Sequence, residues 1–469
     1  MIIKKKQIII FLVSCLIISS QRIVNANPHR ITNITNDLNV DHTAINQKYK
    51  ESSKSNFLIH EFADEFKSIG SVPYIRLKNG EIFTVTSGQN ASISKDEGKT
   101  WNNYPIVDKE NFIISSPVFI ETRNGVIIMA FMNFKEKYWD WDKKIIDAPH
   151  AVLPTYTIRS LDGGKTWQGV QKLHDDWTGA IRSIIETRKG EVIFSSMMLK
   201  HNPAHHTVLT YTSKDNGLSW IRSNILEMGG SGDHSGLMES TLLELNDGRI
   251  WQLIRTNWGY FYESFSKNGG KNWSKPRKTS IDASSSPAAL SRLKSGRLLL
   301  VWNRMYQEGQ NSIPLLGGEQ NPNLSEVAAS WQREELAIAF SDNDGKNWTQ
   351  PVVIAKTNKD SLYKYNPWDS KKWLAYPHIS ELDSGKIRIT TDFGGLHIEI
   401  NESDFVNLSN GDFFIRTNRG VFHESFSRND GVKWSKPQKT IIDASSSPAA
   451  LARPSSGRLV IVRNRRSPL

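Results

Sequence analysis

Few residues of this 469-residue chain have a type and spacing that could perform chemistry by themselves. The single cysteine, Cys15, excludes a disulfide scaffold and a cysteine metal site. The histidines of the segment His201-Asn-Pro-Ala-His205-His206 do not follow a zinc-binding spacing and are better interpreted as loop residues. We therefore expect no metal ion and no cofactor.

Candidate proton donors occur in two segments. Asp140 and Asp142 belong to the aromatic insert Tyr138-Trp-Asp-Trp-Asp142, and Asp233 is followed directly by His234. A carboxyl or imidazole group can act as a general acid when its surroundings tune its pKa. Each of these residues could equally be an ordinary loop residue, so the general acid stays open.

An eight-residue turn motif recurs along the chain and indicates the fold that must position any catalytic residues. Each copy has Ser at the first place, Asp or Asn at the third, Gly at the fifth and Trp at the eighth. The copies begin at Ser94, Ser160, Ser213, Ser266, Ser341 and Ser427. This composition suits a tight hairpin, because Asp or Asn bonds nearby backbone N–H groups, Gly supplies a positive φ and Trp packs onto the sheet.

Short apolar runs between these turns predict strands. They are bounded by Gly turns, mostly Asp-Gly, Asn-Gly or Ser-Gly pairs, and cover residues 81–86, 125–132, 191–197, 249–254, 297–303 and 386–391. Several strands and one fixed turn in every 50 to 75 residues indicate propeller blades. We predict an all-β chain with six blades, of which the sixth, near 374–400, lacks the turn motif and pairs with a strand from 57–66.

Across roughly residues 57–400 this pattern resembles the Asp-box, or BNR-repeat, sialidase superfamily of six-bladed propellers. The resemblance implies catalytic positions outside the boxes. Glu239 and Arg255 of blade four match the family's glutamate and a substrate-binding arginine, Arg333 of blade five matches another arginine, and Tyr376 of blade six matches the nucleophile.

The chemistry implied by the resemblance suits these residue types. Planar guanidinium groups hold a substrate carboxylate in a bidentate manner. That substrate would repel a carboxylate nucleophile, so retaining sialidases use a tyrosine whose proton a glutamate removes. Tyr376 and Glu239 would form this pair.

Two family positions are missing from blade one. Ser71 stands where sialidases carry the first arginine, and the short segment 87–90 holds no acid/base aspartate. Arg182, at the start of blade three, is a candidate replacement arginine, while Asp233, His234, Asp140 and Asp142 are candidate acids.

These observations predict a hydrolase that cleaves sialic acid or another acidic sugar from the ends of glycans or polysaccharides by a retaining mechanism. Two alternatives remain open, a non-catalytic glycan-binding propeller and a lyase acting on uronic-acid polysaccharides. The expected partner is an acidic glycan, and the protein is expected to be a monomer.

The N-terminus has the features of an export signal. Lys4 to Lys6 precede an apolar run and a small-residue cleavage site that ends at Ala26. We expect a signal peptide over 1–26 and a polar leader over 27–55, which favours secreted or periplasmic localisation over a lipid anchor at Cys15. No later segment is long and apolar enough for a transmembrane helix.

The net charge of +11 comes from the two ends of the chain. Residues 1–26 hold four basic and no acidic residues, and residues 411–469 hold eleven basic and four acidic ones, so 44 of each remain elsewhere. Global charge therefore gives no support for nucleic-acid binding by the propeller.

The C-terminal segment 405–469 repeats residues 244–308. Residues 416–465 match residues 255–304 at 35 of 50 positions with a constant offset of 161. Pro454 falls inside an expected strand, where proline removes a ladder donor. We predict a poorly packed appendage to a propeller over 56–404.

Overall fold

The computed structural model describes residues 49–53, 57–67, 73–86, 89–308, 310, 315–358 and 370–409, with five short backbone strands beyond them. The predicted signal peptide, Ser71, residues 87 and 88 and the sixth turn motif lie outside the described residues, as does the leader up to residue 48. None of the described helices is long and apolar enough to span a membrane.

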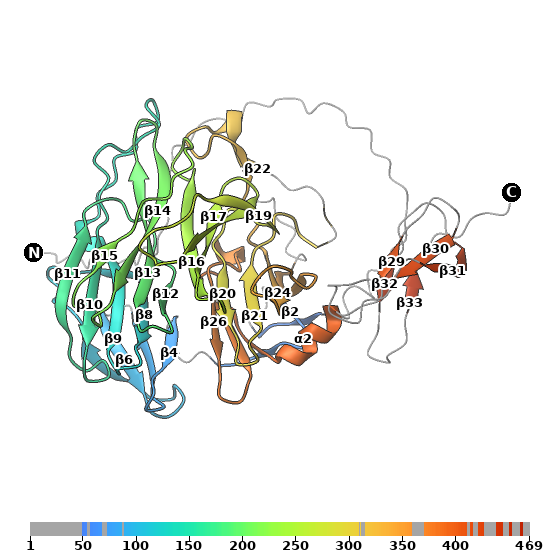
Figure 1. The fold of residues 1–469 in the computed structure, drawn as a ribbon, viewed down its shortest axis with the longest axis horizontal. Coiled ribbons are helices and arrows are strands. Elements are labelled where there is room, and N and C mark those ends of the chain that lie inside the picture. The colour runs from blue at the N-terminus through green and yellow to red at the C-terminus, as the bar shows by residue number, and fades with distance from the viewer. Residues whose placement is uncertain are drawn as a thin grey trace, which may run out of the picture. The chain divides into compact units, whose positions relative to one another are not determined.

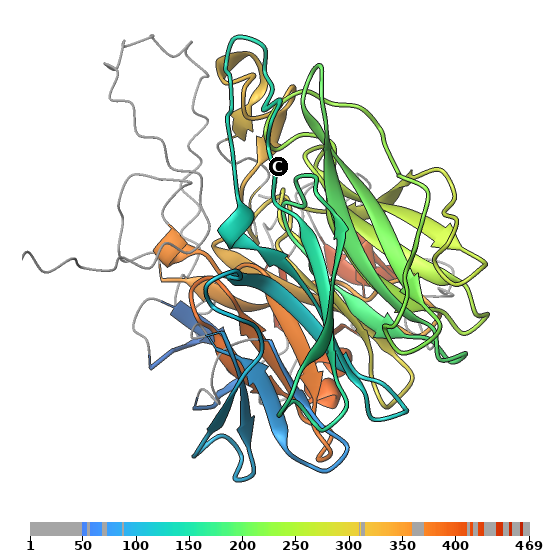
Figure 2. The ribbon, with the colours of Figure 1, turned by 90° about the vertical axis from the view of Figure 1, so that its left-hand side faces the viewer.

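The described chain is nearly all β-structure and forms a six-bladed propeller (Figures 1 and 2). Blade one comprises β4 (Tyr74–Arg76), β5 (Ile82–Val85), β6 (Asn90–Ser94) and β7 (Asn102–Pro105). Blade two comprises β8 (Ile114–Glu121), β9 (Ile127–Asn133), β10 (Thr155–Ser160) and β11 (Gln168–His174). Blade three comprises β12 (Ile184–Glu186), β13 (Val192–Lys200), β14 (His205–Ser213) and β15 (Ile221–Arg222).

Blades four to six complete the propeller. Blade four comprises β16 (Leu237–Glu244), β17 (Ile250–Thr256), β18 (Tyr260–Ser266) and β19 (Arg277–Asp282). Blade five comprises β20 (Ala289–Arg292), β21 (Leu298–Trp302), β24 (Glu335–Ser341) and β25 (Val352–Thr357), extended by β2 (Phe57–His60) and β1 (Tyr49–Glu51). Blade six comprises β26 (Pro377–Glu381), β27 (Ile387–Thr391), β28 (His397–Ile400) and β3 (Asp64–Glu65).

The remaining elements are short. A hairpin of β22 (Leu315–Gly317) and β23 (Ala328–Ser330) interrupts blade five. The helices among the described residues are η1 (Phe134–Glu136), η2 (Gly318–Gln320), η3 (Ser370–Lys372) and α2 (Glu402–Ser409). Phe405 of α2 packs into the core of blades five and six, and β1 pairs with β2.

The six apolar runs in the sequence are confirmed as strands, and each is the second strand of its blade. β9, β17 and β21 are buried along their whole length, whereas the outer strands β11 and β19 are largely polar and half-buried or exposed. A strand packed on both faces between neighbouring blades is mostly apolar, and this makes such runs recognisable in the sequence.

The segment 57–66 does not pair as predicted with one blade only. β2 pairs with β25 of blade five, and after a turn β3 pairs with β28 of blade six. Only the two residues of β3 therefore supply the fourth strand of blade six. The expectation of a single closing strand was wrong, because the chain crosses from one blade to the next at Ala63, which is fully buried.

The predicted hairpin role of the turn motif is confirmed in blades one to five, where it joins the third and fourth strands. In blade one, Ser94 Oγ accepts a hydrogen bond from the Gly98 N–H at 2.8 Å, and Asp96 accepts from the Thr100 N–H at 2.8 Å and its hydroxyl at 2.6 Å. The Trp101 indole donates to the Gly98 carbonyl at 3.1 Å. The motif thus satisfies the backbone of the hairpin with its own side chains.

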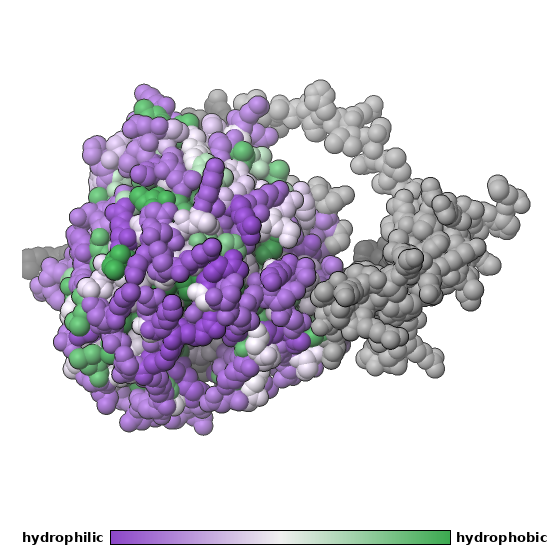
Figure 3. All heavy atoms as spheres, in the orientation of Figure 1, coloured by the Kyte–Doolittle hydropathy of each residue, from purple (hydrophilic) through white to green (hydrophobic). Residues whose placement is uncertain are grey.

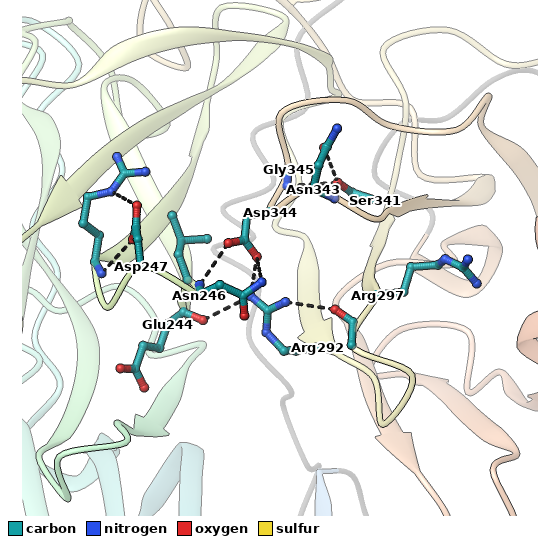
Figure 4. Close-up of polar contacts among 12 residues, drawn as sticks. Glu244, Asn246, Asp247, Arg292, Arg297, Ser341, Asn343, Asp344 and Gly345 are labelled. Carbon is teal, nitrogen blue, oxygen red and sulfur yellow. Dashed lines mark hydrogen bonds and ion pairs between the residues drawn. The ribbon is translucent and has the colours of Figure 1, made fainter. Parts of the chain in front are cut away.

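The turns also join neighbouring blades. The glycine of the fifth motif, Gly345, has φ +77° and leaves only 2.7 Å between a Cβ built on it and the Trp251 ring of blade four. Asp344 beside it accepts hydrogen bonds from the Asn246 N–H at 2.9 Å and from Arg292 at 2.6 Å (Figure 4). Glycine is required there both for its backbone conformation and for the close approach.

The surface around these elements is mainly hydrophilic on the face drawn in Figure 3, with small scattered apolar areas. The duplicated C-terminal segment is described only as backbone strands β29 (Phe413–Ile415), β30 (Val421–Ser425), β31 (Gln438–Asp443), β32 (Ala450–Ala452) and β33 (Val460–Val462). Their pairing order repeats that of β17 to β21 at the same offset of 161. The predicted poor packing of this segment falls outside the described residues.

Candidate active site

The five predicted site residues come from four blades, and local backbone features orient two of them. Glu239 lies at a β-bulge of β16, where the register shifts between Met238 and Ser240. A bulge redirects the side chain of the extra residue. Tyr376 precedes β26 with φ +62°, a left-handed conformation that is unfavourable for a bulky residue. Such strain is common where a side chain must be held in one direction.

Tyr376, Glu239 and Arg255 form a buried hydrogen-bonded triangle. The Tyr376 hydroxyl donates to Glu239 Oε1 at 2.8 Å. Arg255 Nη1 donates to Glu239 Oε2 and lies 3.3 Å from Tyr376 Oη. Glu239 and Arg255 are 7% and 3% exposed, so their ion pair is shielded from solvent. The predicted nucleophile and base are therefore in direct contact.

Ser285 connects the two arginines that the resemblance identified. Its hydroxyl accepts hydrogen bonds from Arg255 Nε at 3.2 Å and Nη2 at 3.1 Å, while its carbonyl accepts from Arg333 Nη2 at 2.8 Å. The Arg333 guanidinium carbon also lies 4.5 Å from the ring centre of Trp373 and 4.8 Å from that of Trp331. Ser285 stands in a run of three serines before blade five, and nothing in that run indicates a role for it.

Arg182 reaches the cluster from blade three and is held by a residue that the sequence analysis missed. Its Nη1 donates to Asp392 Oδ2 at 2.9 Å, and its guanidinium carbon lies 4.8 Å from the centre of the Tyr376 ring. The second oxygen of Asp392 bonds His378 Nε2 at 2.8 Å. Asp392 follows β27 in a turn that resembles any other polar turn, so nothing in the sequence distinguished it.

The electrostatics of the triangle favour an ionised glutamate beside a neutral tyrosine. Burial alone would raise the pKa of Glu239, but Arg255, Tyr376 and Arg182 reverse this effect and hold the pKa below its usual value. Burial and the Glu239 carboxylate raise the pKa of Tyr376, against the opposing influence of Arg255 and Arg333. Glu239 is therefore available to accept the tyrosine proton.

The candidate acids differ in their distance from this cluster. The His234 ring lies 5.0 Å from that of Trp331, which in turn lies 5.6 Å from the Arg255 guanidinium carbon. His234 Nδ1 bonds the carboxylate of Asp233 at 2.9 Å, so this pair borders the cluster through one tryptophan.

Asp140 and Asp142 are engaged elsewhere in the described structure. Asp140 binds the exposed His150 at 2.8 Å. Asp142 exchanges backbone hydrogen bonds with Asp147. Neither acid has a hydrogen bond or an ion pair to the five site residues, and we do not place them in the cluster.

The aromatic residues of the insert 138–142 and of the β17–β18 turn mostly pack against the protein. Trp139 stacks on Trp141 at 5.6 Å, and Trp258 donates to Glu326 at 2.9 Å. Tyr260 lies beneath the ammonium of Lys278 at 3.5 Å. Among the residues that the structure describes, no three His, Cys, Asp or Glu side chains come together in a way that could hold a metal ion.

The fold is that of a sialidase-like propeller, and the cluster brings a tyrosine and a glutamate into contact. The profile of the BNR repeat-like domain family matches residues 90–389, more than half of the chain. The chain belongs to this family, within the BNR-repeat sialidase-like superfamily.

Solved structures with a similar fold include proteins of known and unknown activity. A protein of unknown function from Dyadobacter fermentans is 18% identical with a TM-score of 0.48, covering 75% of this chain and 98% of its own. A Hadza microbial sialidase is 15% identical with a TM-score of 0.46, covering 71% and 65%. The NanB sialidase of Streptococcus pneumoniae is 14% identical with a TM-score of 0.46, covering 73% and 71%. No curated protein sequence matches this chain.

Proposed function

We propose that this chain is a glycoside hydrolase that removes terminal sialic acid, or another acidic sugar, from glycans or polysaccharides by a retaining mechanism. The observation that supports this proposal most directly is the 2.8 Å hydrogen bond from the Tyr376 hydroxyl to Glu239, made beside the Arg255 guanidinium. This arrangement joins a nucleophile to a base within a cationic site.

In the first step, the Tyr376 oxygen attacks the anomeric carbon while its proton passes to Glu239. The bond to the leaving oxygen breaks, and that oxygen takes a proton from a general acid. In the second step, water attacks the anomeric carbon and gives one proton to the conjugate base of the general acid, the bond to Tyr376 breaks, and Glu239 returns the proton to the phenolate. Two displacements at one carbon retain its configuration.

A tyrosine suits an anionic substrate better than a carboxylate would. Arg255 and Arg333 are the candidate ligands for the substrate carboxylate, because both guanidinium groups converge on Ser285. Arg182 adds a third cation beside Tyr376, although its ion pair with Asp392 neutralises part of that charge. Three arginines face two carboxylates, Glu239 and Asp392, so the cluster keeps a positive balance that favours an acidic sugar.

We also propose that the protein acts outside the cytoplasm. The support is the basic and apolar segment 1–26 with its small-residue cleavage pattern. Such a location would give the site access to extracellular glycans.

The test is release of 4-methylumbelliferone from its α-sialoside by purified chain that begins at Asn27. We expect turnover by the wild type and a loss of at least about a thousandfold in Tyr376→Phe, since phenylalanine keeps the ring but removes the attacking oxygen. Tyr104→Phe in β7 is the matched control and should leave turnover unchanged.

The same purified proteins distinguish the hydrolase from the two alternatives, a lyase and a non-catalytic propeller. If the wild type releases no fluorophore, uronic-acid polysaccharides should be tested for products that absorb in the ultraviolet, which would indicate a lyase. Binding of a sialylated glycan without turnover would instead support a non-catalytic propeller. Equal activity of wild type and Tyr376→Phe would contradict the assigned nucleophile.

A further inference from the structure

The tyrosine–glutamate pair leaves one requirement of glycoside cleavage unassigned. The departing oxygen needs a proton in the first step, and the attacking water must lose one in the second. Glu239 holds the tyrosine proton throughout, and its carboxylate oxygens are occupied by Tyr376 and Arg255. A separate acid and base is therefore required next to Tyr376.

His378 and Asp392 have the geometry of such a group. His378 Nε2 lies 2.8 Å from Asp392 Oδ1, and the other carboxylate oxygen accepts from Arg182 at 2.9 Å. A carboxylate on one ring nitrogen fixes the orientation and the tautomer of an imidazole and leaves the other nitrogen for proton transfer. His378 Nδ1 has no hydrogen bond to a described residue, and the side chain is 19% exposed.

The pair lies against the nucleophile. The backbone N–H of Asp392 donates to the Tyr376 carbonyl at 3.2 Å. Arg182, which binds Asp392, also covers the Tyr376 ring with its guanidinium carbon 4.8 Å from the ring centre. One arginine therefore contacts both the nucleophile and the carboxylate that orients His378.

The strand alternation places His378 on the side of blade one. Ile379 packs into the core shared by blades five and six. Successive side chains of a strand point to opposite faces, so His378 and Ser380 face the other way. Tyr74 of blade one lies beside Ser380, which identifies that direction. This is the blade whose sequence lacks an acid/base residue.

We propose that His378, oriented by Asp392, is the general acid and general base of this site. The inference rests on the proposed glycosidase function and adds the proton-transfer group to it. In the first step, the protonated imidazole gives its Nδ1 proton to the leaving oxygen as Tyr376 bonds to the anomeric carbon. In the second step, neutral Nδ1 takes a proton from the attacking water as the bond to Tyr376 breaks.

Asp392 serves in this scheme as a positioning residue. Burial would raise the pKa of Asp392, but His378 and Arg182 together hold it below its usual value, so the carboxylate stays ionised. An ionised Asp392 cannot donate the proton, but it accepts the hydrogen bond that orients the His378 ring. Asp233 and His234 form the competing pair, one tryptophan further from the arginines.

The test compares two sialosides that differ in leaving group, 4-methylumbelliferyl α-sialoside and sialyllactose. A poor leaving group depends far more on acid assistance, so His378→Ala should lower kcat/KM for sialyllactose by about 10² to 10⁴ and for the aryl sialoside by much less. Azide, a nucleophile that needs no base, should restore turnover of the aryl sialoside by this variant and give the sialosyl azide. Asp392→Asn should show the same pattern more weakly.

A matched control and a second measurement distinguish this inference from a structural effect. His150→Ala removes a ring that binds Asp140 at the same 2.8 Å on an exposed loop, and it should leave kcat/KM unchanged for both sialosides. Nitrogen-15 NMR of the wild type should show His378 protonated at Nε2 in its neutral form.

Four outcomes would overturn the proposal, and they differ in whether the glycosidase function survives. Equal losses on both substrates without azide rescue, or a neutral His378 protonated at Nδ1, would reject His378 while the glycosidase function stands. The full pattern in His234→Ala but not in His378→Ala would transfer the role to the competing pair. A wild type that cleaves neither sialoside would reject the sialidase function and this inference with it.

Discussion

The ion pair between Glu239 and Arg255 should dominate the stability of the site. Both side chains are nearly inaccessible to solvent, and each also binds Tyr376. Removing one partner of a buried pair leaves the other charge uncompensated, which typically costs about 3–5 kcal/mol. We therefore expect Glu239→Gln and Arg255→Met each to lower the free energy of unfolding by about that amount.

The double variant tests whether the cost comes from the unpaired charge. With both charges gone, the combined loss should be smaller than the sum of the single losses by about 2–3 kcal/mol. Urea unfolding followed by tryptophan fluorescence gives the free energy of unfolding of the wild type, the two single variants and the double variant. The exposed pair Lys50 and Asp64, 3.0 Å apart, is the control and should show little or no coupling. Additive losses at Glu239 and Arg255, within about 0.5 kcal/mol, would refute the reasoning.

Three further predictions concern the turns and two titrating groups. In urea unfolding, Gly345→Ala should destabilise the chain by about 1–3 kcal/mol more than Gly296→Ala. Both glycines have a positive φ, but only a Cβ at Gly345 would meet a ring, that of Trp251. The Thr100 hydroxyl and N–H lower the pKa of Asp96 to about 2, so the contribution of Asp96 to the free energy of unfolding should be lost as pH falls from about 4 towards 2. Asp96→Asn should remove this pH dependence. Burial lowers the pKa of His206 to about 4, so the free energy of unfolding should fall by roughly 2 kcal/mol between pH 7 and pH 5. A His206→Gln variant that keeps this slope would show that another group causes it.

Repetition made much of the fold predictable from the sequence. The turn motifs mark the third hairpin of five blades, and the apolar runs mark the second strand of all six. Both signals are local, because a hairpin needs particular residues at fixed places and a strand buried on both faces needs mostly apolar residues. The split of 57–66 between two blades was not predictable, since two short strands joined by a turn differ little from one interrupted strand.

The candidate site was only partly accessible from the sequence. Tyr376, Glu239, Arg255 and Arg333 were found through a resemblance, and the structure places them within one cluster. Ser285 has no motif of its own, and its role depends on where two arginines from other strands end.

The sequence by itself determined the residue types, the number of blades and the positions of the turns, because these follow from local chemistry and from periodic burial. Only the tertiary structure decided which charges are neighbours. Arg182 meets Asp392 across 210 residues, and Tyr376 meets Glu239 across 137. Such pairs depend on the closure of the ring, which brings the starts of separate blades together. Their pKa values and their proposed chemistry arise from that contact.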